Sequence, residues 1–126
     1  MTKDILIVDD SQTVRASLKY TLEKNDFGVI AAEDGQEGLD KLAELKSQGK
    51  KPAMIITDIN MPIMDGITFT KEVKKQASFK FIPILVLTTE SQESKKMEGK
   101  EAGAAGWLVK PFKPEQLIGV IKKFVK

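Results

Sequence analysis

Polar groups of complementary chemistry directly follow four separate apolar segments of this sequence. Asp9 and Asp10 follow residues 5–8, Asp58 follows 54–57, Thr88 follows 84–87, and Lys110 follows 107–109. If these segments are parallel strands, their carboxyl ends meet at one edge of the sheet, so the polar groups converge there. Crowded carboxylates repel one another and favour a bound cation, and Mg²⁺ prefers oxygen ligands of this kind.

A lysine and a hydroxyl beside such carboxylates suit the handling of a phosphoryl group. The Lys110 ammonium could hold one phosphoryl oxygen and the Thr88 hydroxyl another, and phosphoryl transfer depends mainly on positioning and charge stabilisation. A carboxylate nucleophile would form an acyl phosphate. Asp58 follows the segment expected at the centre of the sheet, so it is the candidate nucleophile.

Each of these residues also has an ordinary structural explanation. Asp9 and Asp10 could cap the helix that follows them, and Asp58 could be a turn residue. Thr88 could likewise be a cap, and Lys110 could be a solvated surface lysine. All four groups fall directly after a strand-like segment, and this agreement favours a shared site over four unrelated explanations.

The elements expected to position these groups alternate between strand-like and helix-like patterns. Apolar, β-branched strands are predicted at 5–8, 54–57, 84–87 and 107–109, with a weaker one at 28–32. Helical spacing recurs in Val14, Leu18 and Leu22, in Leu39, Leu42 and Ala43, and in Leu117, Val120, Ile121 and Phe124. Helix limits are indicated by Ser11, Asp34, Gly49, Pro52 and Pro114. The predicted fold is an α/β, (βα)5, doubly wound five-stranded parallel sheet.

Composition narrows the function classes. The chain has 126 residues, which fits one domain, and it contains neither His nor Cys. It therefore offers no Cys/His zinc site, thiol nucleophile or Ser-His-Asp triad. No apolar run approaches the ~20 residues that span a bilayer, and the N-terminus is a poor signal peptide. We expect a cytoplasmic location without membrane insertion, which the absence of Cys also suits.

The net charge of +2 does not indicate a nucleic-acid partner. Among the 20 basic residues, only Arg15 is not a lysine, and the lysines alternate with acids along the chain. Nucleic-acid readers favour clustered basic side chains and the planar arginine fork. The lysines are interpreted as solvated helix faces, and no nucleic-acid binding is expected.

Four motifs in order carry a family resemblance. They are residues 5–11 (ILIVDDS), 57–66 (TDINMPIMDG), 87–89 (LTT) and 105–112 (AGWLVKPF). Together they resemble the receiver domains of two-component response regulators, which have a flavodoxin-like, CheY-like fold. Because nothing follows the last predicted helix, the sequence is most similar to single-domain regulators of the chemotaxis type. A single receiver domain at 1–126 without an output domain is expected.

The resemblance implies roles for the polar cluster. Asp58 matches the phospho-acceptor, and Lys110 matches the lysine that pairs with the phosphoryl group. Asp10, Asp58 and the backbone carbonyl of Asn60 match the Mg²⁺ ligands, and Asp9 matches an acid that acts through water.

The resemblance also implies a switch and residues that tune dephosphorylation. Thr88 matches the hydroxyl that moves towards the phosphoryl group, and Trp107 falls at the position of the switch aromatic. Asn60, Thr89 and Glu90 occupy positions that tune hydrolysis, although Asn60 and Glu90 could equally be a turn residue and a helix-flanking acid. Thr89 is larger than the residue often found beside the active threonine, so we expect it to slow access to the site.

By resemblance, the chain is a monomeric signalling switch and not an enzyme acting on another substrate. It would catalyse only its own phosphorylation from a histidine kinase of the chemotaxis type, and its own dephosphorylation. A flagellar-motor switch protein is the expected target, while phosphorelay and phosphate-sink roles stay open. The signal would leave through the fourth helix, the fifth strand and the fifth helix. Residues 91–102 form the least convincing helix, because Gly99 interrupts it and only Met97 and Ala102 offer apolar contacts.

Rival functions fit the residues less well. A haloacid-dehalogenase-type phosphatase needs a second Asp two residues after its nucleophile, where this chain has Asn60. In a flavodoxin-like carrier, Asp9 and Asp10 would repel the flavin phosphate, and the phosphate loop of nucleotidases is absent. A receiver-fold adaptor that works without phosphorylation stays open.

Overall fold

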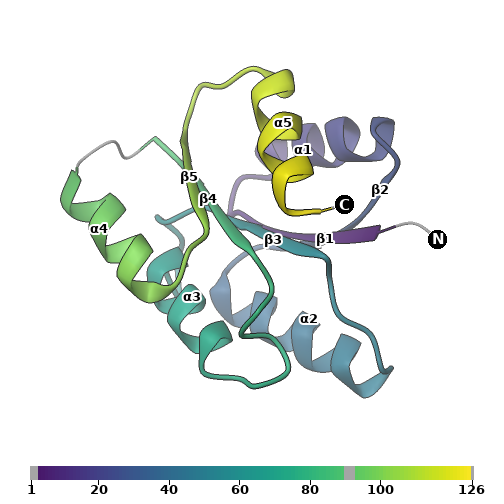
Figure 1. Cartoon of the computed structure of the whole chain (residues 1–126), viewed down its shortest axis with the longest axis vertical. Coiled ribbons are helices and arrows are strands. Elements are labelled where there is room, and N and C mark those ends of the chain that lie inside the picture. Colours follow the sequence, from purple (N-terminus) through teal and green to yellow (C-terminus); the bar gives the residue numbers. More distant parts are fainter. Residues whose placement is uncertain (1–2, 90–92, 126) are drawn as a thin grey trace.

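The computed structural model describes residues 3–89 and 93–125, in which five strands alternate with five helices (Figure 1). The strands are β1 (Lys3–Val8), β2 (Phe27–Ala32), β3 (Met54–Thr57), β4 (Ile84–Thr88) and β5 (Gly106–Val109). The helices are α1 (Gln12–Lys24), α2 (Gly35–Ser47), α3 (Gly66–Lys74), α4 (Glu93–Ala102) and α5 (Pro114–Phe124). All strand pairs are parallel, in the order β2-β1-β3-β4-β5. The predicted (βα)5 sheet is confirmed.

The register of the sheet aligns the carboxyl ends of its strands. Val8 at the end of β1 pairs with Thr57 at the end of β3. Thr88 at the end of β4 pairs with Val109 at the end of β5. The residues that follow these strands therefore emerge at one edge, with β3 at the centre of the sheet.

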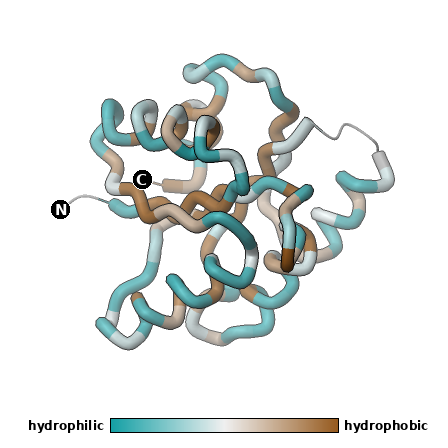
Figure 2. Tube along the Cα trace, turned by 180° about the vertical axis from the view of Figure 1, so that it is seen from behind, coloured by the Kyte–Doolittle hydropathy of each residue, from teal (hydrophilic) through white to brown (hydrophobic). Residues whose placement is uncertain are grey.

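The sheet is covered on both faces, as Figure 1 shows, with α1 and α5 on one side and α2 and α3 on the other. Ile5 and Ile7 of β1 pack in one core cluster with residues of α1 and α5. Leu6 and Val8 point to the other face and pack with residues of α2 and α3. This alternation places the hydrophobic segments in the interior of the trace in Figure 2 and leaves the outer helix surfaces hydrophilic.

Local sequence signals account for the helix limits. The Ser11 hydroxyl accepts a hydrogen bond from the Val14 N–H at 3.2 Å and caps α1. The Asp34 carboxylate caps α2 through the Glu37 N–H at 2.8 Å. Gly49 has a φ of 72° just past the end of α2, where a residue without Cβ adopts the left-handed conformation most readily. Each of these limits agrees with the prediction.

Some details of the helix faces were predicted wrongly. Ala43 and Phe124 were assigned to apolar stripes, but both are exposed, Phe124 to 40%. Met97 was expected to be one of the two apolar contacts of α4, yet it is 49% exposed. Gly99, expected only to weaken α4, is buried.

In the described part of the chain, no helix has the length and apolar character needed to cross a membrane.

Candidate functional site

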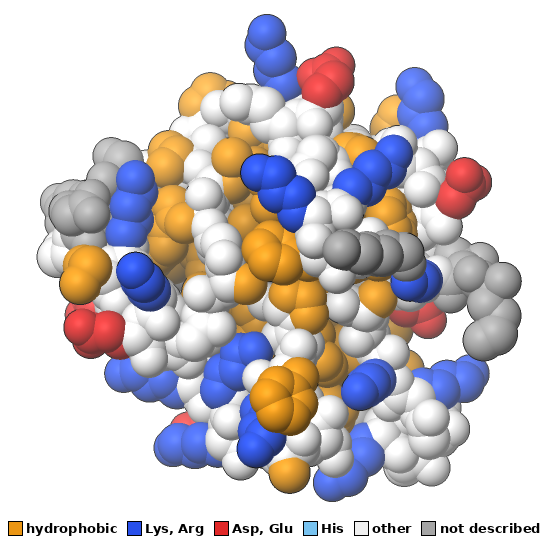
Figure 3. All heavy atoms as spheres, viewed as in Figure 1, with side chains coloured by type: hydrophobic (Ala, Val, Ile, Leu, Met, Phe, Trp, Pro, Cys, Tyr) orange, Lys and Arg blue, Asp and Glu red, His pale blue; other side chains and the backbone are white. Residues whose placement is uncertain are grey.

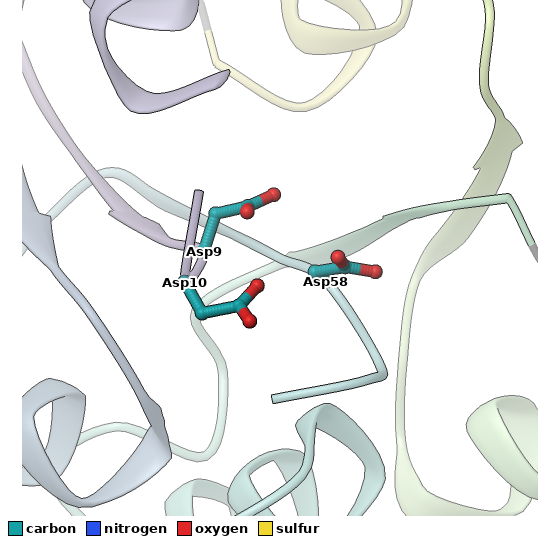
Figure 4. A group of neighbouring side chains, drawn as sticks. All are labelled: Asp9, Asp10 and Asp58. Carbon is teal, nitrogen blue, oxygen red and sulfur yellow. The ribbon is translucent and has the colours of Figure 1, made fainter. Parts of the chain in front are cut away.

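Three carboxylates meet where β1 and β3 end (Figure 4). The Asp58 N–H donates to the Val8 carbonyl at 3.0 Å, and the Asp9 N–H donates to the Ala32 carbonyl at 3.1 Å. These bonds continue the sheet ladder by one residue, so both side chains start from fixed backbone. One carboxylate oxygen from each of Asp9, Asp10 and Asp58 lies within 4.8 Å of the other two. The predicted convergence of the acids is therefore present.

The three carboxylates differ in exposure. Asp9 is buried, Asp58 is half-buried and Asp10 is exposed. The cluster is thus open to solvent on the Asp10 side and closed on the Asp9 side. Oxygen ligands at this separation fit a hard divalent cation, and Mg²⁺ commonly keeps several waters and takes a few carboxylates.

Lys110 joins two of these acids across the sheet. Its Nζ lies 3.1 Å from Asp9 Oδ2 and 3.5 Å from Asp58 Oδ2. The Lys110 N–H donates to the Thr88 carbonyl at 2.8 Å, which fixes the start of its side chain beside β4. Only 18% of the Lys110 side chain is exposed, so its charge acts on the acids with little solvent screening.

The second oxygen of each paired acid is held by the backbone. The Ser11 N–H donates to Asp9 Oδ1 at 2.9 Å, and the Ile59 N–H donates to Asp58 Oδ1 at 2.7 Å. Each carboxylate therefore turns Oδ1 towards a backbone donor and Oδ2 towards Lys110. Since Ser11 caps α1, helix capping does not account for Asp9.

The remaining predicted residues surround this cluster at different depths. Thr88 at the end of β4 is fully buried, whereas Thr89 is exposed. Asn60 is exposed on the β3–α3 loop and lines a cavity of about 250 Å³ between α3 and α4. Trp107 is partly buried on β5. Glu90 lies outside the described residues.

Two supporting residues were not assigned a role from the sequence. A Cβ on Gly66 would lie 1.9 Å from the Asp58 carbonyl oxygen, so this glycine lets α3 begin directly against the site. The Arg15 guanidinium donates to the Asp9 carbonyl at 2.6 Å. For Gly66 the sequence does contain a usable signal, because Asp65 before it is a residue type that caps helices. Asp65 caps α3 in the structure, and Gly66 directly after it contacts the Asp58 backbone.

Comparisons with known proteins point to one family. A model described as the response regulator receiver domain matches residues 5–122. The solved structure of the Vibrio cholerae chemotaxis protein CheY4 is 43% identical, covers 99% of this chain and 100% of its own, and has a TM-score of 0.89.

Curated relatives include larger proteins. The Bacillus subtilis alkaline phosphatase synthesis transcriptional regulatory protein PhoP is 36% identical over 100% of this chain and 50% of its own length. The Helicobacter pylori sensor histidine kinase CheAY is 37% identical over 97% of this chain and 15% of its own. This chain thus spans half or less of the length of these two relatives.

Proposed function

This chain belongs to the response regulator receiver domain family, and we propose that it is a switch phosphorylated on Asp58. The phosphoryl donor would be the phosphohistidine of a partner histidine kinase. The match to CheY4 along essentially the whole of both chains supports a role in chemotaxis. A flagellar-motor switch protein is the corresponding target, and phosphorelay or phosphate-sink roles are the alternatives.

The observation that carries this proposal is the bridge from Lys110 to Asp9 and Asp58. Asp58 Oδ2 lies 3.5 Å from the Lys110 ammonium, whereas the other carboxylate oxygen, Oδ1, accepts the Ile59 N–H. In the transfer, Asp58 Oδ2 attacks phosphorus, the P–N bond to the histidine breaks, and the ring nitrogen keeps the electron pair. Lys110 then holds a phosphoryl oxygen as charge develops on it.

Mg²⁺ is the cation that we propose for the acid cluster, where it would neutralise phosphoryl charge. Asp10 and Asp58 would bind it directly, together with the Asn60 carbonyl. Asp9, which is buried and accepts a hydrogen bond from Lys110 at 3.1 Å, would act through water. Reset would follow when water attacks the acyl phosphate and releases inorganic phosphate and the Asp58 carboxylate, with Asn60, Thr89 and Glu90 tuning that rate.

Transmission of the signal would begin at Thr88. Its side chain is fully buried at the end of β4, and it would shift towards a phosphoryl group on Asp58. Such a shift would alter the packing of α4, β5 and α5. Trp107, which faces β4 across the register at Val86, would follow this change.

Intact-mass measurement after incubation with acetyl phosphate tests the proposal. We expect a single phosphoryl adduct that requires Mg²⁺, persists in Asp40→Asn and is absent from Asp58→Asn. Asp40 is a matched control because it is an exposed aspartate on α2. An adduct that survives in Asp58→Asn would overturn the assignment. No adduct together with no Mg²⁺ binding would favour an adaptor that works without phosphorylation.

The same assay tests the role assigned to Thr89. It is exposed beside the end of β4, where its methyl and hydroxyl groups can restrict access to Asp58. Thr89→Ala is expected to lose its phosphoryl adduct faster than the wild type. An unchanged rate of loss would remove Thr89 from the tuning residues.

A further inference from the structure

The contact between α4 and β5 depends on a glycine and a tryptophan. A Cβ added to Gly99 would lie 2.9 Å from Cζ3 and 3.2 Å from Cε3 of Trp107. The first distance is shorter than van der Waals contact allows, so the indole ring occupies the space that a side chain at position 99 would need. Helix α4 approaches β5 this closely only because residue 99 has no side chain.

The indole N–H of Trp107 is buried. Among the described residues, none accepts a hydrogen bond from its Nε1, which is inaccessible to solvent. Buried donors are nearly always paired, because an unpaired one loses its hydrogen bonds to water without replacement. The position of the ring is therefore set by packing, at the expense of its polar group.

Open space lies beside the same ring. A cavity of about 250 Å³ is lined by Lys96, Lys100, Ala104, Ala105, Gly106 and Trp107. The cavity lies between α4 and β5. On the side of the molecule drawn in Figure 3, hydrophobic side chains lie among lysines. On its inner side, the ring packs against a cluster that includes Val86 and Ala102. The ring is confined at Gly99 and unconfined towards the cavity.

We propose that Gly99 is the positioning residue for Trp107 and that this contact couples α4 to the β4–β5 pair. Position 99 determines whether the ring packs under α4 or moves into the neighbouring cavity, where its N–H regains contact with water. A shift of the ring and a shift of α4 are then one event. This inference rests on the proposed function only for the statement that phosphorylation drives that event.

Tryptophan fluorescence tests the positioning directly, because Trp107 is the only tryptophan in the chain. Gly99→Ala is expected to shift the emission to longer wavelength and to increase quenching by acrylamide. Gly119→Ala is the matched control: Gly119 lies within α5, and a Cβ there would meet nothing within 4 Å. It should leave the spectrum unchanged and raise the folding equilibrium constant about fivefold, since Ala is the better helix former by about 1 kcal/mol.

Double variants separate positioning from a general loss of packing. Gly99→Ala should have a lower folding equilibrium constant than the wild type. The same substitution made in a Trp107→Phe background should lower the constant much less, because the smaller ring leaves room for a Cβ. An equal loss in both backgrounds, or an unchanged emission spectrum in Gly99→Ala, would overturn the assignment. None of these measurements involves phosphorylation, so they stand apart from the acetyl phosphate test.

The link to the acid site is tested with Mg²⁺ and beryllofluoride as a phosphoryl mimic. We expect the mimic to change Trp107 emission in the wild type and to change it by a different amount in Gly99→Ala. Identical responses in the two proteins, or no response in a wild type that forms the acetyl phosphate adduct, would refute the coupling. A wild type that forms no adduct would instead contradict the proposed function.

Discussion

The acid site lies where β1 and β3 end, and the α4–β5 contact lies at the other edge of the sheet from β2. Their residues are held very differently. Asp9 and Asp58 each follow a run of four buried strand residues, 5–8 and 54–57. Each of the two acids accepts a backbone N–H on one oxygen while Lys110 lies beside the other. Helix α4, in contrast, buries only Gly99 and Ala102 among its described residues. One region is fixed by hydrogen bonds and charge, whereas the other is lightly packed, with a small apolar cluster around Trp107 and a cavity beside the ring.

This difference matches what each region would have to do. Phosphoryl transfer needs reacting groups held in one geometry, which rigid strand ends supply. A surface that reports the transfer needs two arrangements of similar free energy, which a lightly packed helix supplies. The comparison leads to predictions that run from the largest expected effect to the smallest.

Gly66→Ala should be the most damaging small substitution in the chain. Its Cβ would lie 1.9 Å from the Asp58 carbonyl oxygen, and backbone at this position cannot give way without moving the site. We expect a loss of about 3 kcal/mol or more in the free energy of unfolding, measured by urea denaturation. If the variant is as stable as the wild type, the acid site is not the rigid region.

Amide hydrogen exchange should divide the molecule along the same line. Residues 97–102 of α4 are expected to exchange at least about 100-fold faster than Ile7 and Ile56 in β1 and β3, because local opening of α4 exposes few buried groups. NMR detection of individual amides would measure this. Equal protection in the two regions would contradict the comparison.

Lys110→Met tests how far the acid site depends on compensating charge. Without the ammonium, the negative charges of buried Asp9 and of Asp58 face each other with no positive charge between them. We expect the free energy of unfolding to fall by about 2 kcal/mol in Mg²⁺-free buffer. Saturating Mg²⁺ should restore more stability to this variant than it adds to the wild type. Lys19→Met, on the exposed face of α1, provides the control for thermal unfolding. A Mg²⁺ response identical in all three proteins would argue against charge compensation.

Lys74, at the end of α3, contacts the segments that lead into β4 and β5. Its ammonium donates to the carbonyls of Lys80 and Ile82 at 2.9 and 2.7 Å, and its stem lies against the position of a Cβ on Gly103. Lys74→Met should lower stability by about 1 kcal/mol, because two carbonyls lose their donor. The exposed neighbour Lys75→Met should have a smaller effect.

The same lysine predicts a pH dependence. Burial lowers the pKa of Lys74. Between that lowered pKa and the ordinary lysine value, the unfolded chain binds more protons at this residue, so its contribution to stability rises with pH. Chemical denaturation at increasing alkaline pH should show a smaller rise for Lys74→Met than for the wild type. Parallel curves would show that Lys74 titrates as if exposed.

Ile63 offers a small gain beside the rigid site. It has a φ of 70° and is 82% exposed, an unfavourable conformation for a β-branched residue that no packing repays. Ile63→Asn should raise the free energy of unfolding by about 1 kcal/mol, since Asn tolerates the left-handed region. Ile63→Val keeps the branching and should change little. Equal effects of the two substitutions would mean that the loop relaxes.

The sequence was sufficient to predict the sheet and the composition of the acid site. Continuous apolar segments give buried parallel strands, and each polar group that follows such a segment must lie at the carboxyl edge. Asp9, Asp10, Asp58 and Lys110 were therefore brought together by topology alone. The helix stripes were less certain at their margins, as exposed Ala43 shows, because a short apolar side chain costs little on either face.

Only the tertiary structure decided how these residues meet. It determined that Asp9 and Asp58 share Lys110 through one oxygen each, and that Gly66 touches the Asp58 backbone. It also placed Gly99 under the ring of Trp107, eight residues away on a different element. A sequence pattern specifies which face of an element is apolar, whereas the contacts across elements depend on register, helix position and shape at the scale of one carbon atom.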